Sequence, residues 1–112
     1  MPRLDYRALR ALIPIRRVLD LLEWSPRTMR GDQWRGLCPL HDWPTGGAPH
    51  FSVNVAKNAY RCFRCKAGGN QLDLWAAYTH LPLNPACLDL CFRLGVEPPL
   101  LPPIRNSENA SR

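Results

Sequence analysis

The sequence that decides the fold is Cys38-Pro39-Leu40-His41, followed after twenty residues by Cys62-Phe63-Arg64-Cys65. In each stretch, two residues separate a pair of side chains that commonly bind metal. A two-residue gap lets a tight knuckle direct both side chains at one ion, and this layout is typical of a structural zinc site with three cysteines and one histidine. We therefore predict one structural Zn²⁺ ion held by Cys38, His41, Cys62 and Cys65.

Two other interpretations of these residues are open. Three buried thiols beside an unrelated histidine would leave the shared spacing of the two pairs unexplained. A redox-active pair at Cys62 and Cys65 would leave Cys38 and His41 without a role, and no βαβ pattern surrounds it. If zinc is present, four protein ligands leave no position for water, so the ion would support structure and would not catalyse hydrolysis.

The charge of the chain favours a nucleic-acid partner. Its 112 residues suffice for one domain with a small core. Fifteen lysines and arginines outnumber nine acidic residues, which gives a formal net charge of +6. Such a balance favours a polyanionic partner, nucleic acid first, although a merely soluble basic protein would carry the same charge.

The sequence shows no signal for export or membrane insertion. The N-terminus lacks the apolar core of a signal peptide, and no apolar run approaches the ~18 residues that a membrane span needs. We expect a cytoplasmic protein without membrane contact. Thiols stay reduced in the cytoplasm, which suits metal ligation better than disulfides.

Hydrophobic periodicity predicts two short helices before the zinc ligands, over residues 4–12 and 15–22, separated by Pro14. Between and around the ligands, alternation and turn residues predict antiparallel strands. These are a strand pair within 28–37, a strand over 50–55 and a returning strand over 59–63. The result is a small α+β fold.

Two further helices are expected after Gly68-Gly69, which should release the chain from the second knuckle. The first is capped by Asn70, with Asp73 favourably placed near its N-terminus, and the second is closed by Gly95. We divide the chain into an N-terminal helical arm (1–14), a zinc-finger domain (15–96) and a proline-rich flexible tail (97–112).

Cys87 and Cys91 are one helical turn apart and lie in line with two leucines. They could hold a metal or sense oxidation, but this pattern favours small residues of the core.

Aromatic and basic residues lie close together in sequence around the predicted zinc site, as expected of a surface that binds single-stranded nucleic acid. Alternation places Arg61 and Phe63 on the same face of their strand, which favours them as surface contacts, whereas Phe51 and Tyr60 fit the core of the hairpin. The candidates for contact are Trp34, Arg35, Lys57, Arg61, Phe63, Arg64 and Lys66.

No catalytic centre is evident. The pairs Gly46-Gly47 and Gly68-Gly69 lack the lysine spacing of a phosphate-binding loop. The pair His41-Asp42 lacks the further histidines and carboxylates of a metal phosphohydrolase. We expect neither catalytic residues nor a small-molecule substrate.

Three stretches closely resemble the zinc-binding domain of bacterial replicative (DnaG-type) primases: WRGLCPLHD (34–42), PHFSV (49–53) and YRCFRCKAGGN (60–70). The resemblance covers roughly residues 10–96. It implies a zinc-ribbon antiparallel sheet flanked by N-terminal and C-terminal helices, which recognises single-stranded template DNA and helps to start primer synthesis. It also implies Cys38, His41, Cys62 and Cys65 as zinc ligands. The residues that would face the template are Arg35, Arg61, Phe63, Arg64 and Lys66.

Two positions depart from the family pattern. The loop after His41 is longer than usual and lacks its charged residues, and Asn70 replaces a common aspartate. The first departure bears on template specificity, and the second exchanges one helix cap for another.

Family primases polymerise with a separate domain whose carboxylates bind magnesium, and this chain ends before such a domain. We expect a nucleic-acid-binding module without polymerase activity of its own, which acts beside a separately encoded polymerase, primase or helicase. The alternatives are a zinc-stabilised protein-interaction adaptor and the N-terminal fragment of a full DNA primase.

Overall fold

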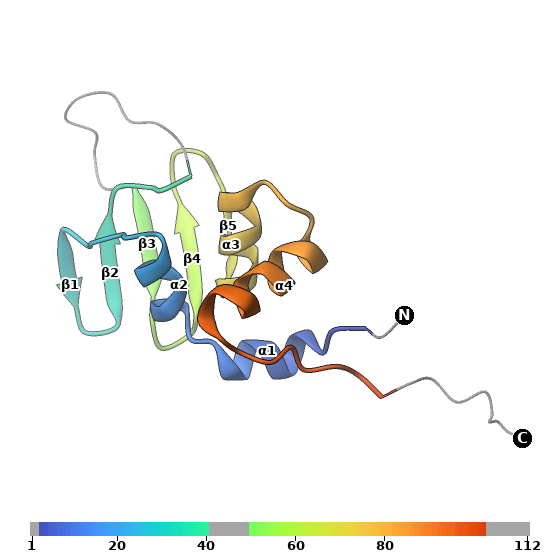
Figure 1. Ribbon diagram of the computed structural model, residues 1–112. Coiled ribbons are helices and arrows are strands. Elements are labelled where there is room, and N and C mark those ends of the chain that lie inside the picture. The colour runs from blue at the N-terminus through green and yellow to red at the C-terminus, as the bar shows by residue number, and fades with distance from the viewer. Residues whose placement is uncertain (1–2, 41–49, 103–112) are drawn as a thin grey trace, which may run out of the picture.

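The computed structural model describes residues 3–40 and 50–102, and its elements follow the predicted order (Figure 1). The helices are α1 (Tyr6–Leu12), α2 (Ile15–Leu21), α3 (Gln71–Thr79) and α4 (Leu83–Leu94). The strands are β1 (Thr28–Arg30), β2 (Gln33–Gly36), β3 (Phe51–Asn54), β4 (Ala59–Cys62) and β5 (Gly68–Asn70).

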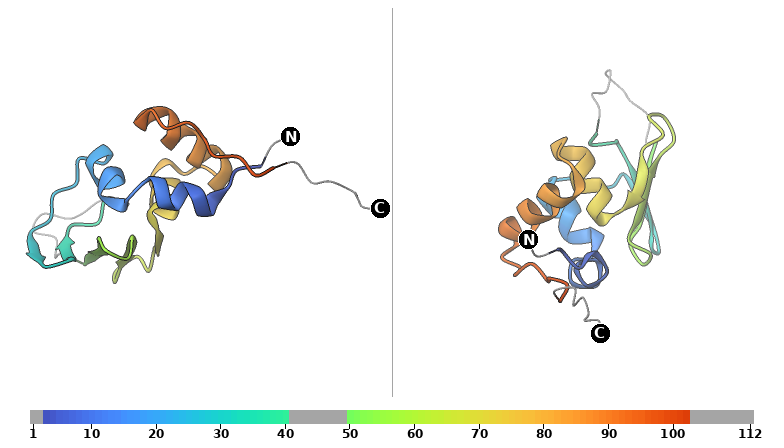
Figure 2. Two further views of the ribbon diagram at one scale, coloured as in Figure 1. Left: turned by 90° about the horizontal axis from the view of Figure 1, so that it is seen from below. Right: turned by 90° about the vertical axis from the view of Figure 1, so that its right-hand side faces the viewer.

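The five strands form one antiparallel sheet in the order β1-β2-β3-β4-β5. The helices stack on one face of this sheet, and within the described residues the opposite face is uncovered (Figure 2). Helices before and after the strands therefore build a single layer behind the sheet. The predicted small α+β fold, an antiparallel sheet flanked by N-terminal and C-terminal helices, is confirmed.

The core fills the space between the sheet and the helices. Phe51 and Val53 of β3 are fully buried there, and Tyr60 of β4 is nearly so. The prediction that Phe51 and Tyr60 belong to the core of the hairpin is therefore confirmed. The helices contribute Leu9, Ile15, Val18, Leu72, Leu74, Trp75 and Leu90.

Cys87 and Cys91 of α4 are core residues, each with 1% of its surface exposed. Burial raises the pKa of the Cys87 thiol to about 11, and burial also raises the pKa of Cys91. Such thiols remain protonated near neutral pH and behave as small apolar groups. The sequence-based interpretation of Cys87 and Cys91 as small residues of the core is therefore confirmed.

The strand β5 was not predicted. Gly68-Gly69 does not simply release the chain, because its backbone pairs with Arg61 and Tyr60 of β4. Glycine is depleted in strands, so composition gave no sign of this pairing. The two glycines lead directly into α3, where Asn70 and Asp73 form the expected reciprocal cap.

The turn between β3 and β4 also fixes the position of α2. Asn58 adopts a left-handed backbone conformation (φ 53°) at this turn. Its side-chain Oδ1 accepts a hydrogen bond of 2.9 Å from the backbone N–H of Ile15, the first residue of α2. A side chain of the hairpin thus satisfies one of the free donors at the start of a helix 43 residues away in sequence.

The two ends of the described chain pair with each other. Leu4 and Leu100 form an antiparallel bridge. The Asp5 N–H donates to the Pro99 carbonyl (2.9 Å), and the Leu101 N–H donates to the Arg3 carbonyl (2.8 Å). Within the predicted tail, residues 97–102 are described, whereas 103–112 lie outside the described residues.

None of the helices in the described ranges is both long and apolar enough to cross a lipid bilayer.

Replacing Asn58 should separate its two contributions to stability. Asn58→Ala removes the hydrogen bond to Ile15 and strains a left-handed backbone, and should lower the free energy of unfolding by roughly 2 kcal/mol. Glycine adopts the left-handed conformation without strain, so Asn58→Gly loses the hydrogen bond only and should lower the free energy of unfolding by about 1 kcal/mol. Urea denaturation of the zinc-loaded protein measures both, and equal losses in the two variants would contradict this account.

Candidate metal centre and the adjoining sheet face

Three of the four predicted zinc ligands lie together in the structure. The Sγ atoms of Cys38, Cys62 and Cys65 are all within 4.8 Å of one another. Cys38 follows β2, Cys62 ends β4, and Cys65 lies in the turn between β4 and β5. The fourth predicted ligand, His41, lies outside the described residues.

The spacing of the sulfurs fits a zinc ion. Zn–S bonds of about 2.3 Å in a tetrahedral site would place two sulfurs about 3.8 Å apart. The Sγ atoms of Cys38 and Cys65 are 4.0 Å apart. All three thiols are free cysteines, so no disulfide competes for them. The cluster could therefore hold a zinc ion with little movement of its side chains.

Backbone amides support negative charge on these sulfurs. The N–H of Leu40 points at the Cys38 sulfur, and the N–H of Cys65 points at the Cys62 sulfur, each with an N···S distance of 3.4 Å. Hydrogen bonds of this kind favour the thiolate form that binds metal. The turn that provides them at the second knuckle requires a left-handed residue, Lys66, with φ 67°.

Burial opposes the same negative charge at Cys38. It raises the pKa of this thiol to about 12, and the neighbouring Cys62 and Cys65 sulfurs raise it too, while the Leu40 amide partly offsets the shift. A thiol in this environment needs an adjacent cation to lose its proton near neutral pH. Zinc supplies such a cation, since a coordinating thiol is deprotonated by the metal.

A tryptophan that sequence reasoning missed supports the first knuckle. The Trp24 indole N–H donates to the Leu37 carbonyl at 2.6 Å, and its ring meets Phe51 edge-on at 5.4 Å. Gly36 permits this packing, because a Cβ atom there would lie 2.8 Å from the Trp24 ring. The missed signal was Gly36, two residues before the predicted ligand Cys38, together with Trp24 upstream.

Beside the three-sulfur cluster lies the uncovered face of the sheet, and the strand register makes it polar. Arg35 of β2 and Arg61 of β4 both pair with Ser52 of β3, so the three residues form one row across the sheet. On the same face, two residues farther along each strand, a second row pairs Gln33 of β2 with Asn54 of β3. The core residues described above occupy the alternate positions and face the helices.

One aromatic ring lies near both arginines of the first row. The Phe63 side chain is 45% exposed, and its ring lies 5.5 Å from Cζ of Arg35 and 5.7 Å from Cζ of Arg61. The prediction that Arg61 and Phe63 share a face of the strand is confirmed. Two cations beside a partly exposed ring form a site at which a flat ring such as a nucleobase can stack while the cations meet neighbouring phosphates.

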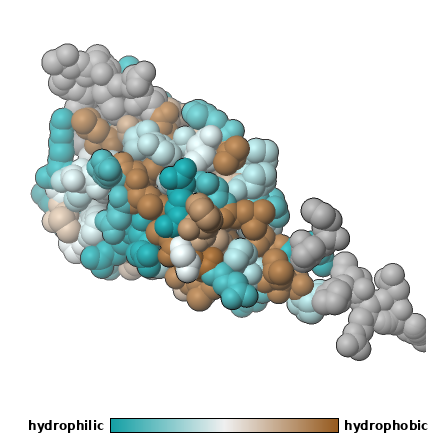
Figure 3. Space-filling view, viewed as in Figure 1, coloured by the Kyte–Doolittle hydropathy of each residue, from teal (hydrophilic) through white to brown (hydrophobic). Residues whose placement is uncertain are grey.

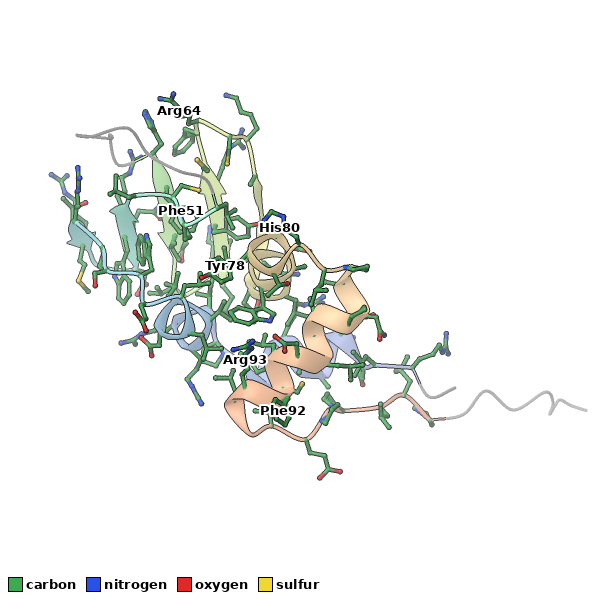
Figure 4. All side chains as sticks on the ribbon, turned by 45° about the horizontal axis from the view of Figure 1, so that its top comes forward. Phe51, Arg64, Tyr78, His80, Phe92 and Arg93 are labelled. Carbon is green, nitrogen blue, oxygen red and sulfur yellow. The ribbon has the colours of Figure 1, made fainter. Side chains whose placement is uncertain are left out.

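The other predicted contacts are more scattered. Arg64 and Lys66 are exposed in the second knuckle, and Figure 4 shows Arg64 at the end of the molecule that carries this knuckle. Lys57 is exposed in the turn at the other end of β3 and β4. Trp34 lies on the helix-facing side of β2, where Arg16 of α2 stacks on its ring at 5.4 Å. The structure thus separates Trp34 from Arg35, Arg61 and Phe63.

Sequence reasoning also missed a groove at the edge of the uncovered face. It has a volume of about 430 Å³ and is lined by Thr28, Arg30, Gln33 and Arg35 of the β1–β2 hairpin. Arg30 was not a candidate because the alternation in a three-residue edge strand is too short to assign a face. Only the register of β1 against β2 shows that Arg30 and Arg35 lie on the same face of the sheet.

Comparison with known proteins identifies related chains. The CHC2 zinc finger family matches residues 7–103. A DNA primase of Synechocystis sp. is 37% identical over 79 residues, which are 70% of this chain and 12% of the relative. A DNA primase of Synechococcus elongatus is 33% identical over 96 residues, 85% of this chain and 13% of the relative. The chain therefore spans about an eighth of the length of these relatives.

A solved structure gives the same relationship in three dimensions. The crystal structure of the Aquifex aeolicus primase, comprising zinc-binding and RNA polymerase domains, superimposes with a TM-score of 0.66 at 27% sequence identity. The match covers 96% of this chain and 24% of that one. Together with the cluster of three cysteines, these matches establish that the chain belongs to the CHC2 zinc finger family of DnaG-type primases.

Proposed function

We propose that this chain is a zinc-stabilised module that binds single-stranded DNA template during primer synthesis. One observation carries the proposal: a basic, polar sheet face that none of the described helices covers lies next to the three-sulfur cluster, with the exposed Phe63 ring near both Arg35 and Arg61. A base can stack on the ring while the guanidinium groups approach the flanking phosphates.

In this proposal Cys38, His41, Cys62 and Cys65 hold one zinc ion, whose role is structural. The zinc joins the end of β2 to the end of β4 and thereby fixes the position of Phe63, which directly follows Cys62. With three thiolates and a neutral imidazole the site carries a net charge of −1, which Arg64 and Lys66 in the second knuckle offset. The resulting surface remains suited to a polyanion.

The polymerase activity of the family would come from elsewhere. DNA primase is the name of relatives that are roughly eight times longer than the matched part of this chain. The metal site that the described residues suggest is made of cysteines, whereas phosphoryl transfer relies on magnesium held by oxygen ligands. We propose that the chain presents template to a polymerase domain or to a helicase, either within a longer protein or as a separate partner.

A second candidate function, a protein-interaction adaptor, is favoured by a different surface. Phe92 of α4 is 86% exposed, and Leu88 one turn earlier is 44% exposed. Apolar side chains gather over this region (Figure 3), which is remote from the knuckle that carries Arg64 (Figure 4). Exposed apolar residues of this kind are found at protein–protein contacts. The adaptor function becomes the better explanation if the chain binds DNA at low salt no more tightly than a neutral control protein.

Removing zinc should unfold at least residues 35–68. Apparent zinc binding in finger peptides is on the order of 10–16 kcal/mol, comparable with the roughly 5–15 kcal/mol that stabilises a whole domain. Addition of excess chelator should therefore abolish most of the near-ultraviolet circular dichroism from Trp24 and Trp34. An unchanged spectrum together with complete zinc release would contradict a structural role for the ion.

The predicted ligands can be tested against a matched cysteine. Cys62→Ala should lose bound zinc and unfold in the same region, since three ligands hold the ion far less tightly than four. Cys87→Ala removes an equally buried thiol from α4 and should keep one zinc per chain. The zinc content of the purified variants, measured by atomic emission, distinguishes them, and zinc loss in both would contradict the assignment.

Phe63→Ala should weaken binding to a labelled oligothymidylate by roughly 5- to 150-fold, because each stacked base contributes ~1–3 kcal/mol. Phe92→Ala removes a more exposed phenylalanine at a distance from the sheet face and serves as the control. Fluorescence anisotropy at low salt measures both affinities, and the zinc content of each variant shows whether the fold is retained. Equal affinities for the two variants would exclude stacking on Phe63.

A further inference from the structure

The groove on the β1–β2 hairpin is a second polar feature of the uncovered sheet face, separate from Phe63. Thr28 and Arg35 are directly opposite each other, as are Arg30 and Gln33. Arg30 and Arg35 are therefore diagonal neighbours on one face, a separation of about 7–8 Å across which two long side chains can reach the same ligand. The four residues that line the groove include no acid.

Hydrogen bonding leaves this groove mainly with donors. The Gln33 amide is already engaged, since its Nε2 donates to Ser52 and its Oε1 accepts from Asn54 at 3.4 Å. Within the part of the chain that the structure describes, neither Arg30 nor Arg35 forms an ion pair. The two guanidinium groups and the Thr28 hydroxyl can thus turn to a ligand, and converging donors of this kind bind phosphate.

Arg35 connects the groove with the aromatic site. Its guanidinium lies 5.5 Å from the Phe63 ring, while the same residue lines the groove. Strands in a sheet are about 4.8 Å apart, so the path from β4 to the edge strand β1 is roughly 14 Å long. This path is long enough for more than one nucleotide and is basic at both ends.

We propose that single-stranded nucleic acid crosses the sheet from Phe63 toward β1, and that Thr28, Arg30 and Arg35 in the groove bind one of its backbone phosphates. This inference rests on the proposed function and adds to it a direction and a second subsite. The strand runs across the β-strands, with a base held at Phe63 and a phosphate held at the edge hairpin. Phosphate contacts carry no sequence preference, so the groove adds affinity and orientation.

The test measures affinity and its salt dependence for full-length, zinc-loaded protein with oligothymidylates of increasing length. Arg30→Ala should weaken binding by roughly tenfold, because a charge-assisted hydrogen bond is lost. It should also make the slope of log K against log salt less steep by about 0.7, the value for one phosphate of a single strand. Both effects should appear only with oligonucleotides long enough to reach β1, because the shortest ones occupy Phe63 alone.

Three further variants make the result specific. Arg30→Lys keeps the charge and should restore the slope. Thr28→Val keeps the shape of the side chain and should weaken binding without changing the slope, because it removes a hydroxyl and no charge. Arg17→Ala removes an exposed arginine from α2, on the helix-covered side, and should match the parent chain in both measurements.

The outcomes separate the two proposals. If Arg30→Ala behaves like Arg17→Ala while Phe63→Ala still loses affinity, the groove is not a phosphate subsite and the proposed function stands. If Arg30→Ala weakens binding equally at every length, the path across the sheet is wrong. If the parent chain shows no salt-dependent binding at all, the proposed function and this inference both fail.

Discussion

Three sulfur atoms within 4.8 Å of one another are the constraint on which the rest of the structure depends. They come from the end of β2, the end of β4 and the turn into β5, up to 27 residues apart in sequence. A chain with so small a core has little other means of fixing these strand ends. Ligation of a zinc ion by these sulfurs would set the register of the sheet at one end, and hydrophobic packing completes it at the other.

The register in turn divides the side chains between two environments. On one face, Phe51, Val53 and Tyr60 pack against the helices and supply the buried apolar area. On the other face, Arg35, Ser52 and Arg61 meet in a row that none of the described helices covers. A shift of one residue in any strand would exchange these sets, placing arginines in the core. The cysteines that bring the strand ends together would therefore also determine which charges reach the surface.

The sequence predicted best those features that depend on residues close together in the chain. Alternation assigned Phe63 and Arg61 to one face because the period of a strand is a local property. The capping pair Asn70 and Asp73 followed from spacing in the same way, and so did the helical pattern around Cys87. The nearness of Cys38 to Cys62 could be predicted only because side chains that bind one zinc ion must lie within a few ångströms of one another.

Features that depend on pairing between distant segments could not be predicted. The strand β5 exists because β4 offers it backbone partners, although glycine itself disfavours strands. The contact between the Trp34 ring and Arg16, from a helix 18 residues earlier, is another such feature. The role of Trp24 beside Gly36 depends likewise on a contact that no periodicity encodes.

The bridge between Leu4 and Leu100 holds the two ends of the described chain side by side. Both ends leave the fold beside α1, at the end of the molecule opposite the knuckles (Figure 1). Chain ends that lie together on the surface allow a domain to be inserted into a loop of a host protein. A host protein could therefore carry this finger through two adjacent junctions beside α1, and the knuckles would lie at the end far from the host.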